Sequence, residues 1–174
     1  PSSFIVMYGD RKIWVDASAR PHETLAGVNV NWDDITDYLV SHNHEDHIQG
    51  FPAALQRKVE QGGKLSVITT PRIYETLKLQ FGDLFPEMDS YVELTAVDPQ
   101  EALNFHGASF DFRYCHHLLE SGTLGFKVTY DGRTLGFSGD TKYKQGFAEL
   151  LGDPKLSAEW FRDCQLILHE VDLK

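Results

Sequence analysis

The sequence predicts an α/β fold in which β-sheets are flanked by helices, a β-sandwich with helices on its outside. In the first half of the chain, β-rich runs alternate with segments of helical periodicity, the pattern of α/β layering. In the second half, β-rich runs follow one another, and Asp131-Gly132 between two of them is a strong hairpin signal. With 174 residues, 41% of them hydrophobic, the chain is long enough for a hydrophobic core, and one domain over residues 1–174 is expected.

The first half begins with two short β-rich runs separated by the turn residues Gly9 and Asp10, which predicts a hairpin. A buried strand is expected next, because an apolar Tyr-Leu-Val run leads directly into a cluster of histidines. Apolar residues at helical spacing follow, with Pro52 in the first turn and Gly62 as a stop signal. The expected elements are strands over 2–7, 12–15, 35–41 and 64–69 and helices over 48–59 and 71–81.

The second half has the character of antiparallel β-structure, with two short helices before a final buried strand. That last strand is the apolar run Leu-Ile-Leu, and it leads into His169 and Glu170. No internal repeat or linker interrupts the pattern. The expected elements are strands over 91–97, 109–114, 125–130, 134–138 and 165–168 and helices over 146–151 and 156–161.

Charge and composition restrict the functional classes. The formal net charge of −10 disfavours binding to a long nucleic acid, whereas a small anionic substrate stays compatible if metal ions reverse the charge locally. No apolar run is long enough to cross a bilayer and no leader is readable, so a cytoplasmic protein without a membrane partner is expected. Cys115 and Cys164 are interpreted as free thiols.

The strongest functional signal is the run His42-Asn43-His44-Glu45-Asp46-His47. His42 and His44 are two residues apart, so both can point to one side of an extended segment and share a metal. Asp46 and His47 are adjacent and point in different directions, which suits a second metal nearby. Nitrogen and carboxylate ligands suit Zn, Mn or Fe. A purification tag would be terminal poly-histidine, whereas this cluster is internal, mixed with acids and placed between a strand and a helix.

Two further groups at strand ends could complete a pair of metal sites. His116 and His117 follow one expected strand, and Asp140 follows another. Alone, an Asp after Ser-Gly is more readily a turn residue than a metal ligand. Together with the cluster, it is a candidate for a carboxylate that bridges two metals.

These residues resemble the metallo-β-lactamase superfamily, whose signature is the His-x-His-x-Asp-His run found at 42–47. The resemblance covers nearly the whole chain, and Val15-Asp16 matches an early strand that ends in Asp. The run 138–141, Ser-Gly-Asp-Thr, is similar to the phosphodiesterase branch, which includes tRNase Z. The resemblance implies an αββα sandwich with two divalent metals, most often zinc, at one edge.

The resemblance also implies a ligand set. His42, His44 and one of His116 or His117 would hold the first metal, and the family's spacing favours His117. Asp46 and His47 would hold the second metal, and Asp140 would bridge. His169 has two interpretations, a proton-transfer group acting with Glu170, which is preferred, or the last metal ligand. The family's first strand has no counterpart before Pro1, and the chain stops soon after His169 and Glu170, where the family's last metal-binding histidine would still follow, so a domain truncated at both ends is expected.

The expected function is hydrolysis by a water or hydroxide that bridges two metals, with Asp46 anchoring the second metal and helping to hold the nucleophile. Asp140 and its Ser-Gly-Asp-Thr context favour a phosphodiester over a β-lactam, and a cyclic nucleotide or other small phosphodiester over RNA. The alternatives are a thioester hydrolase of the glyoxalase II kind and a metal-binding sensory module with little catalysis. A diiron redox protein is disfavoured, because the diiron members of the superfamily carry Glu at the position of His44. Homodimer formation and a further domain are both compatible with the sequence.

Overall fold

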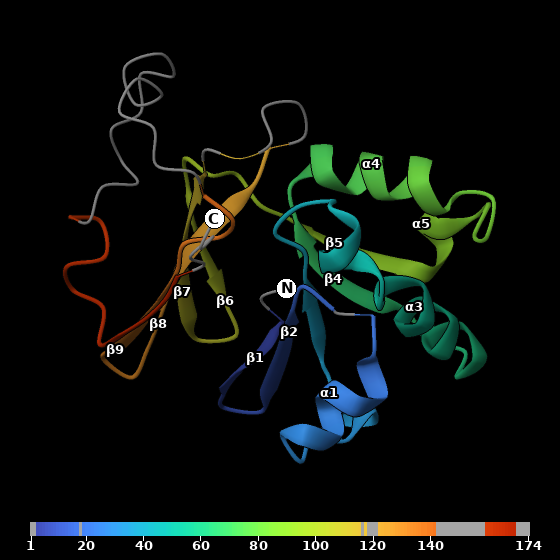
Figure 1. Cartoon of the computed structure of the whole chain (residues 1–174), viewed down its shortest axis with the longest axis horizontal. Helices are drawn as coiled ribbons and strands as arrows, with labels where there is room; N and C mark the ends of the chain where they lie inside the picture. The colour runs from blue at the N-terminus through green and yellow to red at the C-terminus, as the bar shows by residue number, and fades with distance from the viewer. Residues whose placement is uncertain (1–2, 18, 116, 118–121, 142–158, 170–174) are drawn as a thin grey trace, which may run out of the picture. The chain divides into compact units, whose positions relative to one another are not determined.

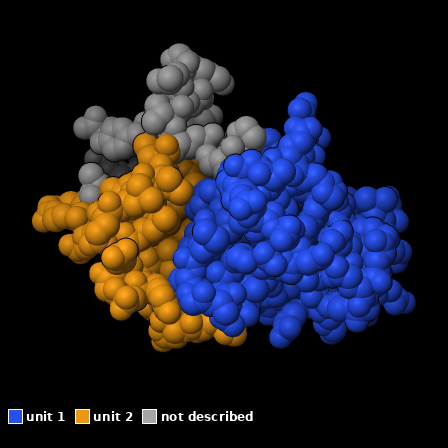
Figure 2. Space-filling model, turned by 90° about the horizontal axis from the view of Figure 1, so that it is seen from below, with its two compact units in different colours: residues 1–96 blue, residues 97–174 orange. Residues whose placement is uncertain are grey.

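The computed structural model describes residues 3–17, 19–115, 117, 122–141 and 159–169. The chain divides into two compact units, residues 1–96 and residues 97–174, which Figure 2 shows in separate colours. Each unit has its own five-stranded sheet (Figure 1). The predicted α/β class with mixed sheets and flanking helices is confirmed. None of the described helices is long and apolar enough to span a bilayer.

The sheet of the first unit combines a hairpin with a parallel ladder, in the order β1-β2-β3-β4-β5. The hairpin pairs β1 with β2 in antiparallel register, and its turn residue Gly9 has a φ of 52°. From β2 onward every neighbouring pair is parallel, so these strands end at one edge of the sheet. The strands are β1 (Phe4–Tyr8), β2 (Arg11–Val15), β3 (Asp37–Leu39), β4 (Leu65–Thr69) and β5 (Val92–Ala96).

Helices connect the parallel strands, as the alternation in the sequence predicts. Pro52 lies in the first turn of α3, where its missing N–H costs no hydrogen bond. Thr70 caps α4, because its hydroxyl accepts a hydrogen bond from the Ile73 amide. The helices are α1 (Pro21–Gly27), the 3₁₀ helix η1 (Trp32–Asp34), α2 (Glu45–Ile48), α3 (Phe51–Glu60), α4 (Pro71–Phe81) and α5 (Met88–Tyr91).

The short strand β3 is fixed at its start by a buried ion pair. Asp37 is fully buried and accepts two hydrogen bonds from Arg11, at 2.7 and 3.1 Å. Ser66 on the other neighbouring strand donates to the same carboxylate at 2.7 Å. Because one side chain bonds to both flanking strands, Asp37 sets the register of β3 between β2 and β4.

The second unit is a mainly antiparallel sheet in the order β10-β9-β8-β7-β6, in which only β10 and β9 are parallel. Its core is a contiguous set of phenylalanine rings with centroids 5.5–5.9 Å apart, Phe110, Phe112, Phe126 and Phe137. The strands are β6 (Ala102–Phe105), β7 (Ala108–Tyr114), β8 (Leu124–Tyr130), β9 (Arg133–Phe137) and β10 (Leu166–Leu168).

The strands expected from the sequence are all present, although β3 is shorter than expected. The helix expected over 71–81 is confirmed without change, whereas the one over 48–59 is divided at Gln49 and Gly50 into α2 and α3. The helix expected over 146–151 lies outside the described residues. The helix expected over 156–161 is wrong where it is described, because residues 159–161 form turns. Trp160 is held against the β7–β8 sheet instead, where its indole N–H donates to Asp111 at 2.8 Å.

Candidate metal centre

One group of candidate site residues lies at the carboxyl edge of the first sheet. Asp16 directly follows β2, and Ser41 and His42 follow β3 by two and three residues. Because β2 and β3 are parallel, these side chains converge at the same edge, where α/β proteins usually bind ligands. All three are buried. The parallel topology therefore brings together residues that are about 25 positions apart in the sequence.

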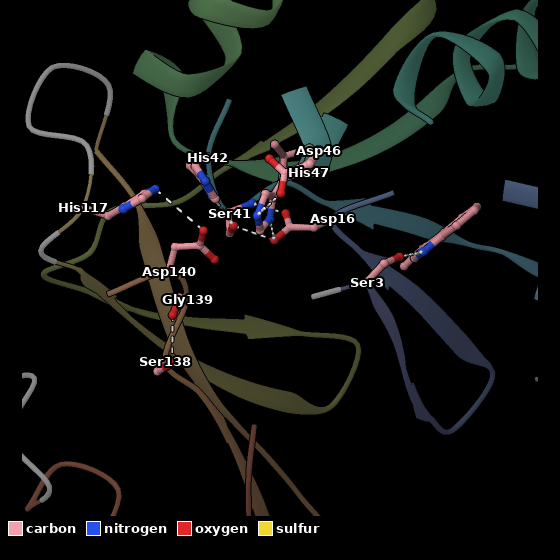
Figure 3. Close-up of polar contacts among 12 residues, drawn as sticks. Ser3, Asp16, Ser41, His42, Asp46, His47, His117, Ser138, Gly139 and Asp140 are labelled. Carbon is pink, nitrogen blue, oxygen red and sulfur yellow. Dashed lines mark hydrogen bonds and ion pairs between the residues drawn. The ribbon is translucent and has the colours of Figure 1, made fainter. Parts of the chain in front are cut away.

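Asp16 is the centre of this group (Figure 3). Its carboxylate accepts from the Ser41 amide at 2.8 Å and from the Ser41 hydroxyl at 2.6 Å. The Asp16 oxygen that accepts from the Ser41 hydroxyl, Oδ2, also lies 3.0 Å from Nδ1 of His47. Burial raises the pKa of the Asp16 carboxyl, and the bonds from His47 and Ser41 act in the opposite direction. Asp16 also has a φ of 51°, a conformation uncommon outside glycine that is often found at functional sites.

The hydrogen bonds determine which ring nitrogen of each histidine carries the proton. The Ser41 hydroxyl gives its one proton to Asp16, so towards Nδ1 of His42, 3.0 Å away, it can only accept. An ionised carboxylate also only accepts, so Nδ1 of His47 donates to Asp16. Both rings therefore carry their lone pair on Nε2. This is the arrangement in which a carboxylate orients a histidine that binds a metal.

His44 and Asp46 complete the cluster at the start of α2. His44 is the N-cap residue of α2, and its ring centroid lies 4.8 Å from that of His42. The Asp46 carboxylate is more than half exposed and lies 3.6 Å from Nε2 of His47. The rings of His42 and His47 are 4.1 Å apart. The structure therefore brings together all four predicted residues of the first unit, His42, His44, Asp46 and His47.

Asp16 and Ser41 were not among the predicted site residues, although Asp16 had been noted as a family match. Ligand atoms of Asp16, His42 and His47 lie within 4.8 Å of one another, the spacing of a possible metal site. Because Asp16 already bonds Ser41 and His47, we interpret it as a group that orients ligands. The sequence signal for Asp16 was an acid placed directly after the wholly apolar end of β2.

A second group of candidate site residues lies at one edge of the second sheet. Strands β7, β9 and β10 run in the same direction, because β8 is antiparallel to both β7 and β9 and β10 is parallel to β9. Their carboxyl ends therefore share an edge. The residues that follow them are His117 after β7, Ser138 and Asp140 after β9, and His169 after β10.

His117 and Asp140 face each other at this edge (Figure 3), with Nε2 of the imidazole 3.6 Å from a carboxylate oxygen. Both side chains are largely buried, at 15% and 13% exposure, as expected of a prepared pair of ligands. The structure thus brings His117 beside the predicted bridging carboxylate. His116, the alternative ligand, lies outside the described residues, as does Glu170, the predicted partner of His169.

Ser138 links this edge to His169. Its hydroxyl lies 2.8 Å from Nδ1 of His169, and its amide donates to Leu168 O at 3.0 Å. The buried thiol of Cys115 donates to the carbonyl oxygen of Ser138 at 2.7 Å. Asp140 thus faces His117, whereas His169 faces Ser138.

Comparison with known proteins identifies the family of the chain. The family model described as "Anti-Pycsar protein Apyc1" matches residues 1–173. A curated relative, the cGMP-dependent 3′,5′-cGMP phosphodiesterase A of Dictyostelium discoideum, is 28% identical over 146 residues, which are 82% of this chain and 16% of that protein. The chain therefore spans about a sixth of the length of that relative.

Two solved structures share the fold. The metallo-β-lactamase fold protein YhfI of Bacillus subtilis is 20% identical with a TM-score of 0.67, covering 86% of this chain and 58% of that chain. Zn²⁺-bound PqqB of Methylobacterium extorquens is 18% identical with a TM-score of 0.58, covering 78% and 48%. The family match over residues 1–173 shows that the chain belongs to the Apyc1 anti-Pycsar family, and the solved structures show that it has the metallo-β-lactamase fold.

Proposed function

We propose that this chain hydrolyses small phosphodiesters, a cyclic nucleotide being the preferred class, with the help of two divalent metal ions. The observation that carries the proposal is the Asp16-centred network. Through Ser41 and His47, one buried carboxylate fixes the Nε2 lone pairs of two neighbouring imidazoles. Such orientation by a second group is typical of metal-binding histidines.

The residues present fit a pair of metals. In the proposed ligand set, which the family resemblance implies, His42, His44 and His117 hold one metal, Asp46 and His47 hold the other, and Asp140 bridges. All six ligands offer nitrogen or carboxylate oxygen and none offers thiolate, a donor set that suits Zn, with Mn or Fe as alternatives. The zinc-bound relative PqqB supports zinc as the first metal to test.

Bound metals would polarise the phosphoryl oxygen and lower the pKa of a coordinated water towards neutrality. The chain's own residues supply the rest. We assign to Asp46, whose carboxylate is more than half exposed, the role of holding the attacking water, and to His169 that of moving a proton at the leaving-group oxygen. The positive charge of the metals would also offset the acidic surface of a chain with a net charge of −10, so that an anionic substrate can approach.

A phosphodiester substrate is supported by the curated relative that carries this activity on cGMP, and by Asp140 within a Ser-Gly-Asp-Thr run. In the same proposal a small phosphodiester is preferred to RNA because of the negative net charge. Homodimerisation and a cytoplasmic setting belong to the proposal as well.

The proposal is tested by loading the purified protein with Zn²⁺ or Mn²⁺ and measuring cleavage of bis(p-nitrophenyl) phosphate and of 3′,5′-cyclic nucleotides. Asp46→Ala is expected to abolish turnover of both substrates. Glu45→Ala is the matched control. Glu45 is the neighbouring exposed acid, and its carboxylate accepts a hydrogen bond from the side chain of Gln49, which is not a proposed ligand. Unchanged turnover in Asp46→Ala would overturn the assignment, and cleavage of acyl-glutathione alone would favour the thioester hydrolase.

A further inference from the structure

We infer that Ser138 is a positioning residue that holds His169 in a single tautomer, with Nδ1 protonated and Nε2 as the atom that exchanges protons. The inference rests on the proposed function for its catalytic part, whereas its structural part stands on the contacts of Ser138 alone. It assigns a role to a buried hydroxyl that the ligand set leaves without one.

Donor counting gives the tautomer. The Ser138 hydroxyl donates its one proton to the carbonyl oxygen of Gly139 at 2.8 Å. Towards Nδ1 of His169, also 2.8 Å away, the same oxygen can therefore only accept. Nδ1 must carry the proton, and the lone pair of a neutral His169 lies on Nε2. Free in water, an imidazole side chain prefers the opposite tautomer, so the contact with Ser138 has a measurable consequence.

Ser138 is itself held rigidly. It is 1% exposed, its amide extends the parallel pairing of β9 with β10, and its carbonyl accepts the Cys115 thiol. A side chain at Gly125 would come within 2.9 Å of the Ser138 carbonyl oxygen, so this strand end is closely packed. A hydroxyl fixed in this way can orient its partner precisely enough to matter for proton transfer.

His169 differs from the buried imidazoles of the first unit. His169 is exposed as a residue while its Nδ1 is anchored by Ser138, and we assign the contact with another molecule to Nε2, the other ring nitrogen. In the cationic form, Nε2–H gives its proton to the departing alkoxide oxygen as the P–O bond breaks. The ring then returns to the neutral form, with Nδ1–H still donated to Ser138, and regains a proton at Nε2 from water.

The structural part is tested by ¹⁵N NMR of histidine-labelled protein at about pH 8.5, where an ordinary imidazole is neutral. His169→Gln identifies the resonances. The wild type should show Nδ1–H as the main tautomer of His169, and in Ser138→Ala the ratio of Nδ1–H to Nε2–H should fall about five- to tenfold, the worth of one hydrogen bond. Ser138→Thr keeps a hydroxyl and should restore the wild-type ratio. A wild-type His169 protonated at Nε2, or an unchanged ratio in Ser138→Ala, would overturn the inference.

The catalytic part is tested by comparing leaving groups in the metal-loaded protein. An alkoxide needs a proton to depart, whereas p-nitrophenolate does not. Ser138→Ala should therefore lower kcat about tenfold for a 3′,5′-cyclic nucleotide and by less than about twofold for bis(p-nitrophenyl) phosphate. Equal losses on both substrates, or loss of bound metal, would refute the proton-transfer role. If the wild type cleaves neither substrate, the proposed function fails while the NMR result still decides the tautomer.

Discussion

A carboxylate oxygen of Asp16 lies 3.0 Å from Nδ1 of His47, and both side chains are completely buried. The contact joins the end of one parallel strand to a helix 31 residues further along the chain. It makes the metal-binding form of His47 dependent on a residue that is not itself a proposed ligand. Three predictions concern residues of this kind, which support the site without forming it, and one concerns the fold alone.

Asp16→Asn should weaken metal binding while leaving the fold intact. The amide is nearly isosteric with the carboxylate, but it carries no charge and can offer an N–H where His47 needs an acceptor. We expect a loss of about 10- to 100-fold in metal affinity, the usual effect of removing an orienting carboxylate. Competition with a chromophoric chelator measures this. Asp10→Asn, in the exposed turn between β1 and β2, removes the same charge and should bind metal like the wild type; equal affinities for all three proteins would contradict the role of Asp16.

Asp37→Asn should destabilise the protein without directly changing the metal site. Asp37 is fully buried and Arg11 is 18% exposed, so the variant leaves a largely buried guanidinium without its counter-charge. The expected loss is about 3 kcal/mol in the free energy of unfolding, the lower end for a broken buried pair. Urea unfolding followed by circular dichroism measures it. Asp34→Asn breaks the exposed pair with Lys12 and should cost less than about 1 kcal/mol; similar losses in the two variants would contradict the prediction.

Cys115 should be unreactive in the native protein. The thiol is buried and donates to Ser138 O, and burial raises the pKa of Cys115 well above its ordinary value, with the charge of Asp140 adding to the effect. Because a group with a raised pKa stays protonated as the pH rises past the usual thiol range, little thiolate forms at about pH 8. In a Cys164→Ser background, a thiol reagent should label the unfolded chain and not the folded one. Rapid labelling of the folded protein would show that this strand end opens readily.

Gly139→Ala should be more disruptive than another glycine substitution at positive φ. Gly139 has a φ of 61°, and a Cβ there would lie 2.5 Å from Leu124 O. Gly132 has a φ of 70° with no atom within 4 Å of the added Cβ, so Gly132→Ala measures the backbone strain alone. We expect a cost of about 1 kcal/mol for Gly132→Ala and about 1–3 kcal/mol more for Gly139→Ala. Chemical unfolding of both variants checks this, and equal midpoints would exclude a steric effect at Gly139.

Much of the fold could be predicted from the sequence, because turn residues and apolar periodicity indicated the same elements. At α4, Pro71 suits the first turn and the apolar residues Ile73, Leu77 and Phe81 recur at helical spacing, so both ends of the helix were predicted correctly. The region from 156 to 161 shows the opposite case. Its apolar spacing suggested a helix, but the contact of Trp160 with the β7–β8 sheet outweighs the local preference of a short segment.

The candidate site was predictable where its residues are contiguous. The run from His42 to His47 has ligand spacing on one short segment, and the structure brings these residues together as expected. Ser41 and Ser138 could not be recognised, because a hydroxyl has no ligand signature and its role depends on which acceptor takes its proton. That information lies in contacts across neighbouring strands, between residues 25 and 31 positions apart.

Strand β3 anchors an ion pair at its first residue and delivers a histidine three residues beyond its last. Asp37 and His42 are thus separated by about 16 Å of nearly extended chain. Mutations that alter ligands or the loops around them can accumulate at one end while the register of the sheet is maintained at the other. Because the two ends are separated, substrate preference can change during evolution through the loops and ligands without loss of the ion pair that fixes the register of the sheet.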